Sequence, residues 1–190
     1  MIIPAKKKEP ILSENFQNML YRATGDLDYK TRTLDIQRFK FKIFKKLTQN
    51  QDLLHALHSE EFGGDGELNG DLFRDVHIFS FMKLPDHKTN VKNYVCFDVT
   101  KENYNKPITV ITFRAISHID DYQTDWGINR QDLLAEIITH EFNWTSEFGM
   151  HFELQYDSSH TTNDGYIWRE LRFVADSIND AHNKININVR

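Results

Sequence analysis

The stretch ITVITFRAISH, from Ile108 to His118, is rich in β-branched residues and is the clearest strand pattern in the chain. It is preceded by Tyr94–Val99, in which every second residue is apolar. Residues 102–106 between them have the composition of a turn. The two stretches are therefore expected to form an antiparallel hairpin, from residues 94–99 and 107–118, with a long loop.

Three further stretches have strand patterns. Residues 76–84 are strand-like and end before Pro85, and residues 150–156 alternate between apolar and polar side chains. Residues 166–176 form the last predicted strand. It follows a polar turn at residues 157–165, so the last two strands are expected to pair with each other.

Two amphipathic helices are predicted outside these strands. The first is expected to start at Asp35, whose carboxylate can accept hydrogen bonds from the unpaired backbone N–H groups of a first turn. Its apolar positions recur at spacings of three and four: Ile36, Phe39, Ile43, Phe44 and Leu47. A short helical run, Asp52–His58, continues this helix or breaks from it at Asn50.

The second helix is predicted to start at Asn129 as its N-cap. Asp132 follows in the first turn, where the helix dipole favours a negative charge. The expected buried stripe consists of Leu133, Leu134, Ile137, Ile138 and Phe142. Between the first helix and the strands, residues 59–73 form an acidic, glycine-rich segment that is expected to be an exposed and mobile loop.

The order of elements predicts an α+β fold, with a mostly antiparallel sheet of about five strands and two main helices packed on one face. The core domain is expected to span residues 34–176. Residues 1–33 form an N-terminal arm with a possible short helix capped by Ser13, and residues 177–190 form a C-terminal tail. Both ends are expected to order against neighbouring subunits or partner proteins, because neither can build a core of its own.

Composition narrows the class of protein. Cys96 is the only thiol, so an intrachain disulfide is impossible, which suits a reducing compartment or a particle assembled in one. No apolar run approaches the ~18 residues that span a bilayer, and the N-terminal residues do not read as a secretory signal. The net charge of −5 is uneven: residues 1–115 carry 18 Lys and Arg against 15 Asp and Glu, whereas residues 116–190 carry 5 against 13. The acidic second part argues against an extended DNA-binding surface.

The basic part of the first helix contains Arg38, Lys40, Lys42, Lys45 and Lys46. An amphipathic helix usually exposes such residues to solvent, so a solvated helix face is the expected interpretation.

Carboxylates are the strongest candidates for chemistry. Asp120, Asp121 and Asp125 lie in one loop with Glu136 nearby, and a metal-dependent nuclease could use such a group to hold Mg²⁺. However, no Lys stands at a Glu-x-Lys spacing beside the group. An acidic, solvated loop is therefore the preferred interpretation.

Histidines and the cysteine give weaker signals. His55 and His58 could share a metal on one helix face, but no further ligand motif stands nearby. His140-Glu141 is half of a zinc-protease helix, in which Trp144 replaces the second histidine. Cys96 lies within a strand, as a small buried side chain would.

Nucleotide-binding and nucleophile motifs are also missing: the sequence contains no Gly-x-Gly-x-x-Gly, Walker or Gly-x-Ser-x-Gly pattern. The sequence therefore predicts no enzyme, and no catalytic, cofactor-binding or metal-binding residues.

The layout of residues 34–176 resembles the head-to-tail neck and tail-terminator proteins of tailed bacteriophages. The similarity lies in the order of elements and in local strings: KIFKKL before Asn50, the strand at residues 108–118, and the helix that begins Arg130-Gln131-Asp132. Such proteins form a ring, commonly hexameric, that caps the tail tube or joins it to the portal side. DNA passes through the centre of the ring, and family members have no catalytic residues.

The resemblance implies a structural virion protein located in the neck or tail and made in the host cytoplasm. Its implied partners are copies of itself, tail tube or sheath proteins, head-side connector proteins, and DNA that passes without sequence-specific binding. No membrane partner is implied. A metal-dependent nucleic-acid enzyme and a cytosolic interaction module are the alternatives.

Overall fold

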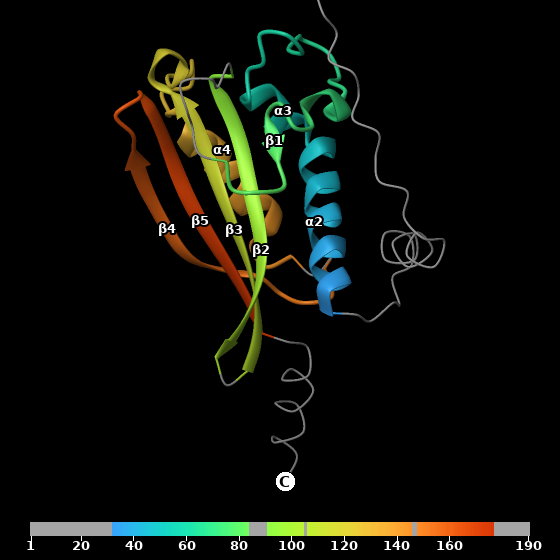
Figure 1. The fold of residues 1–190 in the computed structure, drawn as a ribbon. Coiled ribbons are helices and arrows are strands. Elements are labelled where there is room, and N and C mark those ends of the chain that lie inside the picture. Colours follow the sequence, from blue (N-terminus) through green and yellow to red (C-terminus); the bar gives the residue numbers. More distant parts are fainter. Residues whose placement is uncertain (1–31, 84–90, 105, 146–147, 177–190) are drawn as a thin grey trace, which may run out of the picture. The chain divides into compact units, whose positions relative to one another are not determined.

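The computed structural model describes residues 32–83, 91–104, 106–145 and 148–176 (Figure 1). The chain divides into two compact units, Met1–Arg38 and Phe39–Arg190. Helix α2 (Arg32–Gln49) crosses the boundary, and residues 32–38 at its start are the part of the first unit that is described. The possible helix after Ser13, the N-terminal arm up to residue 31 and the tail from residue 177 lie outside the described residues.

The second unit is built on a five-stranded sheet with the order β1-β2-β3-β5-β4. Neighbouring strands pair antiparallel, except for β1, which runs parallel to β2. The predicted α+β class with a mostly antiparallel sheet is thus confirmed. The strands are β1 (Ile78–Phe79), β2 (Asn93–Tyr104), β3 (Lys106–His118), β4 (Glu153–Thr161) and β5 (Tyr166–Asp176).

The hairpin is longer than the sequence indicates. Strands β2 and β3 stay in register from Asn93↔Ser117 to Tyr104↔Lys106, so the long loop expected at residues 102–106 is wrong. Glu102 is held in the sheet by Arg172 of β5, at 2.8 Å. The polar residues thus stay in the ladder with β3, and a charge pair from a distant strand lies beside them, where local composition favours a turn.

The strand expected at residues 76–84 is also wrong in extent, because β1 has only two residues. The chain turns just before it: the N–H groups of Val76 and His77 both bond to the carbonyl of Phe73. Phe73 ends a short 3₁₀ helix, η1 (Gly70–Phe73), and its ring is fully buried. The end of the expected 59–73 loop is therefore part of the packed structure, whereas residues 63–67 are exposed.

The helices differ from expectation at their starts. Helix α2 begins three residues before Asp35, which lies inside it, so the predicted N-cap is wrong. Of the two alternatives left open at Asn50, the structure shows the break: the Asn50 side chain accepts a 2.8 Å hydrogen bond from the Leu53 N–H and caps α3 (Gln51–Ala56). Asn129 occupies the N-cap position of α4 (Arg130–Phe142), but its side chain makes no capping bond.

The main core lies between the sheet and the helices. Phe113, in the central strand β3, contacts Phe142 of α4 at 4.8 Å and Phe173 of β5 at 5.8 Å between ring centroids. Phe148 stacks on both Phe142 and Phe39 of α2, so α2 and α4 share one aromatic cluster. The expected packing of both helices on one face follows from these contacts, and Figure 1 shows α4 running across the back of the sheet.

The expected stripe of α4 is partly corrected. Leu134, Ile138 and Phe142 are buried, but Leu133 and Ile137 are only half-buried. The opposite face of the sheet carries a smaller buried cluster around Tyr94, Cys96, Ile116 and Tyr166.

The C-terminal hairpin keeps its predicted pairing with changed limits. Strand β5 has the predicted bounds, 166–176. Strand β4 starts at Glu153 rather than 150 and continues to Thr161, so the connecting turn is shorter than expected. None of the described helices is long and apolar enough to cross a membrane.

Candidate functional site

The Asp-rich connection after β3 does not gather its carboxylates at one point. Asp121 ends the short 3₁₀ helix η2 (Ile119–Asp121) and has a side chain that is 16% exposed. Asp120, by contrast, is 69% exposed and lies 3.3 Å from His118, and Asp125 is exposed. Glu136 lies 3.8 Å from Arg169 on the side of α4. The four predicted acidic candidates thus do not converge on one point: three have separate partners, and Asp125 is exposed.

Asp121 is the centre of a polar cluster that local sequence patterns did not reveal. We call it the Asp121 cluster: Asp121, His58, Asn93 and Arg130. One carboxylate oxygen accepts hydrogen bonds from Asn93 Nδ2 at 2.6 Å and lies 3.0 Å from His58 Nδ1. The other lies 3.2 Å from Arg130 Nη2. The cluster joins the end of α3, the start of β2, η2 and the first residue of α4.

Most hydrogen bonds of the Arg130 guanidinium go to backbone carbonyls, and one goes to a side chain. Its guanidinium donates to the carbonyls of Ala56 at 3.1 Å and Asp121 at 2.8 Å, and it reaches Gln123 O at 3.5 Å. The residue is buried, and these carbonyls come from two separate segments, the end of α3 and the connection between β3 and α4. Arg130 therefore acts as a buried cross-link of loop backbone, a role that suits the planar fork of a guanidinium.

A second polar connection lies beside the Asp121 cluster. The buried His77 ring bonds through Nδ1 to the carbonyl of Asn93 at 2.7 Å and through Nε2 to Ser59 Oγ at 2.9 Å. A serine–histidine contact of this length can serve nucleophilic catalysis. Here Ser59 Oγ also accepts the Phe62 N–H at 3.1 Å, and both residues are buried. The contact fastens the loop after α3 to the start of β2.

A cavity of about 220 Å³ opens next to these residues and is lined in part by His58, Ser59, His77 and Lys92. Among the described residues, no three or more His, Cys, Asp and Glu side chains lie together so that they could hold a metal ion. His58 itself is engaged with Asp121 and has a positive φ of 48°. The geometry favours a structural junction over a metal centre.

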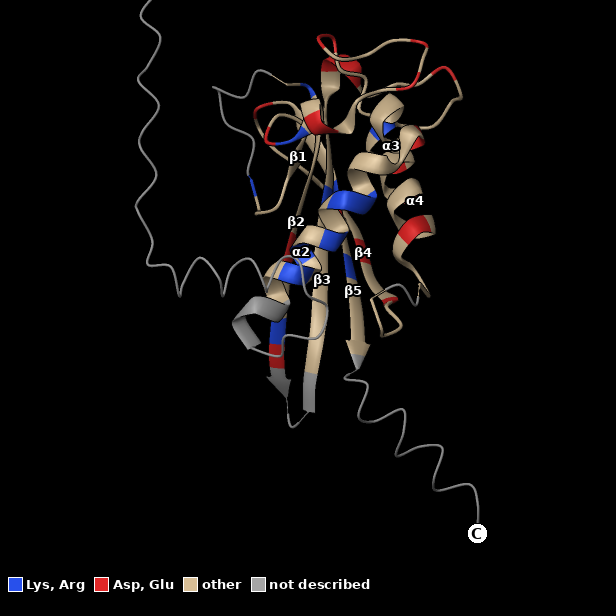
Figure 2. Ribbon diagram, turned by 90° about the vertical axis from the view of Figure 1, so that its right-hand side faces the viewer, with Lys and Arg blue, Asp and Glu red and all other residues tan. Residues whose placement is uncertain are grey.

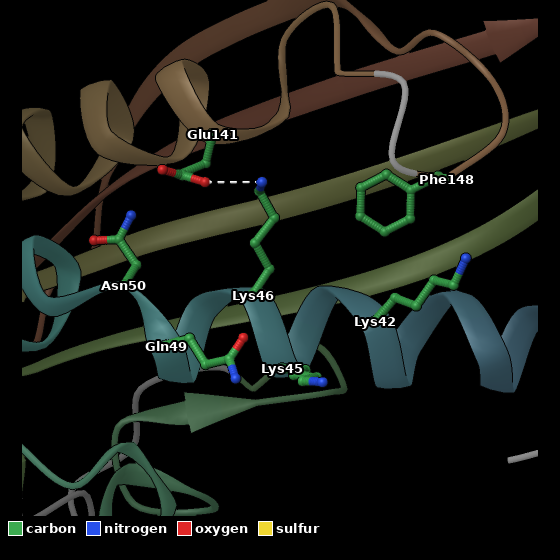
Figure 3. A pocket seen from close by; sticks show the side chains of 7 residues that line it. All are labelled: Lys42, Lys45, Lys46, Gln49, Asn50, Glu141 and Phe148. Atoms are coloured by element: carbon green, nitrogen blue, oxygen red, sulfur yellow. Dashed lines mark ion pairs between the residues drawn. The ribbon is translucent and has the colours of Figure 1, made fainter. Parts of the chain in front are cut away.

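A second candidate site is a cleft of about 460 Å³ between α2 and α4 (Figure 3). We call it the α2–α4 cleft. Lys46 bridges it to Glu141 at 3.0 Å, and Lys40, elsewhere on α2, pairs with Asp98 at 2.6 Å. The basic residues of α2 are therefore only partly a solvated face. The cleft is lined by Lys42, Lys45, Lys46, Gln49, Asn50, Glu141 and Phe148.

A family model described as YomW matches residues 50–175. This is about two-thirds of the chain. The chain belongs to the YomW family. The family name is phage-derived, which indicates a phage-associated protein. A comparison with curated proteins finds no match to the chain.

The YomW match contains the whole Asp121 cluster together with Ser59 and His77. It also contains the α4 side of the α2–α4 cleft, with Glu141 and Phe148. Lys42, Lys45 and Lys46 lie before residue 50, outside the matched region. The YomW region therefore coincides with the sheet, α3, α4 and the polar junction that links them.

Within the YomW region, the pKa shifts of Asp121, His77 and Cys96 follow from burial and hydrogen bonding. Burial raises the pKa of Asp121, but the hydrogen bonds from His58 and Asn93 and the charge of Arg130 outweigh it, so this pKa lies below its ordinary value. Burial lowers the pKa of His77 below 6.5, although the bond to the Asn93 carbonyl acts in the opposite direction. Burial also raises the pKa of the Cys96 thiol to about 11, so Cys96 is a poor nucleophile at neutral pH.

We predict that His77 makes stability depend on pH below 6.5. The unfolded chain takes up a proton on this histidine near pH 6.5, whereas the folded chain does so only at lower pH. Stability is therefore full above pH 6.5 and falls as the pH decreases through the folded-state pKa, by at most about 1.4 kcal/mol per pH unit for one proton. Urea unfolding between pH 5 and pH 8 measures this effect. The His77→Gln variant should lose part of the slope, and an unchanged slope would contradict the assignment.

Proposed function

We propose that this chain is a ring-forming structural subunit of the neck of a tailed-bacteriophage virion, a tail terminator that caps the tail tube and joins it to the head connector. The observation that carries the proposal is the membership of residues 50–175 in a family with a phage-derived name. The order of helices and strands in the same region agrees with the resemblance to neck and tail-terminator proteins.

Open sheet edges support assembly. Strand β4 pairs with β5, and among the described strands nothing pairs with its other edge. Strand β1 covers β2 only at Val95 and Cys96, so the rest of that edge also has no strand partner in the described part of the chain. Exposed edges are templates for pairing with another chain. Neighbouring subunits or terminal arms are suitable occupants in a ring.

Exposed aromatic side chains add possible contact points. Trp126 is 77% exposed and Trp144 is 62% exposed. Tryptophan is enriched in protein–protein interfaces and is costly to leave in water. In the proposed ring these side chains meet neighbouring subunits, tail tube or sheath proteins, or head-side connector proteins.

A structural role also suits the polar groups and the charges. Asp121, the most buried of the candidate carboxylates, is committed to Arg130, Asn93 and His58. The proposal is accordingly that the chain is not an enzyme and that its place is the virion, after synthesis in the host cytoplasm. A net charge of −5 is consistent with DNA passing through a ring without being gripped.

The first test is the oligomeric state of the purified full-length chain. We expect light scattering to give a closed multiple of 22.5 kDa and negative-stain microscopy to show rings with a central opening. A stable monomer would contradict the proposal and favour an interaction module. Cleavage of DNA or RNA that depends on Mg²⁺ or Mn²⁺ would favour the nucleic-acid enzyme. The Asp120→Ala/Asp125→Ala double variant tests that activity without disturbing Asp121.

A further inference from the structure

The α2–α4 cleft combines positive charge with an apolar floor. Lys46 is neutralised by Glu141 at one end, and the ring of Phe148, only 7% exposed, lies at the other (Figure 3). Lys42 and Lys45 make no ion pair with any other described residue. Gln49 and Asn50 line the cleft with side-chain amides. The ammonium groups of Lys42 and Lys45 can pair with carboxylates, and the two side-chain amides can bond to peptide backbone. The cleft is therefore suited to an acidic peptide segment.

The same chain exposes such a segment. Residues 60–67 read Glu-Glu-Phe-Gly-Gly-Asp-Gly-Glu, and Glu61, Asp65 and Glu67 are all exposed. A Cβ added at Gly64 or Gly66 would meet nothing within 4 Å, so the tip of the loop stands free of the rest of the fold. We call residues 60–67 the acidic loop.

The acidic loop does not fill the cleft of its own chain. Phe62 packs on Phe73 at 5.7 Å, and the Gln51 side chain bonds both backbone groups of Leu68, at 3.0 and 2.8 Å. These contacts fix both sides of the loop, and no loop residue lines the cleft. Figure 2 shows the lysines along α2 and acidic residues in the loops at the α3 end of the unit. The two charged surfaces are therefore separate.

We propose that the acidic loop of one copy docks into the α2–α4 cleft of the next copy, with Glu61, Asp65 and Glu67 facing Lys42 and Lys45. The inference rests on the proposed ring and names the contact that closes it. Because the two surfaces differ, the contact is heterologous, and a repeated heterologous contact generates a ring when its rotation closes. Charge complementarity sets the register of the contact and excludes wrong orientations.

A second copy fits the cleft better than a nucleic-acid backbone. The cleft offers two side-chain amides and the ring of Phe148 beside its lysines, and these groups suit a peptide better than a chain of phosphates. A peptide loop can offer carboxylates to Lys42 and Lys45 and backbone groups to the side-chain amides of Gln49 and Asn50.

Paired charge reversals test the contact in the full-length chain. Variant one is Lys42→Glu/Lys45→Glu, and variant two is Glu61→Lys/Asp65→Lys/Glu67→Lys. Each alone presents like charges on both surfaces, so each should lose the oligomer. Mixed in equal amounts, every contact between the two variants is again complementary, and the oligomer should return. Asp164→Lys, which reverses an exposed carboxylate in the turn between β4 and β5, is the control and should assemble as the wild type does.

Light scattering at low and high salt measures assembly, and circular dichroism confirms that each variant is folded. High salt should weaken the wild-type oligomer, because exposed ion pairs are screened. Wild-type assembly by either variant alone, or a mixture that stays monomeric, would overturn the contact while leaving the ring in place. If variant one assembles normally but loses affinity for duplex DNA, the cleft binds nucleic acid instead. A wild type that never assembles would overturn both the ring and the contact.

Discussion

Substituting Ile138 by Asp should unfold the second unit. Ile138 is fully buried on the face of α4 that packs against the sheet, close to Leu134 and Phe142 in the same stripe. A carboxylate there has neither water nor a partner, and the lost apolar volume leaves a cavity. We expect a loss of about 3–5 kcal/mol in the free energy of unfolding. This is comparable to the whole stability of a marginal domain.

The neighbouring position provides the control. Ile137 is only half-buried, so the carboxylate of Ile137→Asp can turn toward solvent. Its melting temperature should fall much less than that of Ile138→Asp, although both are isoleucines in the same helix turn. Thermal unfolding followed by circular dichroism makes the comparison. Equal effects at the two positions would show that the orientation of α4 on the sheet is wrong.

Replacing Arg130 by Met should be the second most damaging single change. The variant leaves the carboxylate of Asp121 without its cation and removes donors from the carbonyls of Ala56 and Asp121. Removing one partner of a buried ion pair typically costs about 3–5 kcal/mol. Lysine should rescue only part of this loss, since one ammonium group cannot reach carbonyls in several directions.

Arg172→Met is the matched control for Arg130→Met. Arg172 also pairs with a carboxylate, Glu102 at 2.8 Å, but its side chain is 42% exposed. Exposed pairs contribute about 0–1 kcal/mol, so this variant should unfold at nearly the wild-type urea concentration. If both arginine variants lose the same stability, the Asp121 cluster is not the junction described above. The pKa of Asp121 is lower in the folded chain than its ordinary value of 3.8. The carboxylate therefore contributes its full share to the free energy of unfolding above pH 3.8, and this share is lost as the pH falls through the lower folded-state pKa.

Local periodicity was sufficient for the elements that carry the core. The β-branched run at residues 108–118 became the central strand β3, and the last strand has the predicted bounds, 166–176. The candidate break at Asn50, with continuation of the helix as its alternative, could be placed because capping depends on a side chain and a backbone group only three residues apart. In each case the residues that determine the element are neighbours in sequence.

Other features depend on residues that are far apart in the chain. The two-residue β1 and its parallel pairing with β2 follow the turn after Phe73, and the β2 end of the long hairpin meets Arg172 of a distant strand. Half-burial of Ile137 follows from the angle at which α4 meets the sheet, which periodicity does not specify.

The sequence by itself determined the α+β class, the order of the main elements and the resemblance to phage neck proteins, because these follow from local patterns along the chain. The tertiary structure alone decided which charges meet. His58 and Asp121 are 63 residues apart, and Arg130 and Ala56 are 74 apart, yet each pair is in hydrogen-bond contact. Whether Lys46 faces solvent or Glu141 depends likewise on how two helices pack. Electrostatic partners are set by distance in space, and only the folded chain fixes that distance.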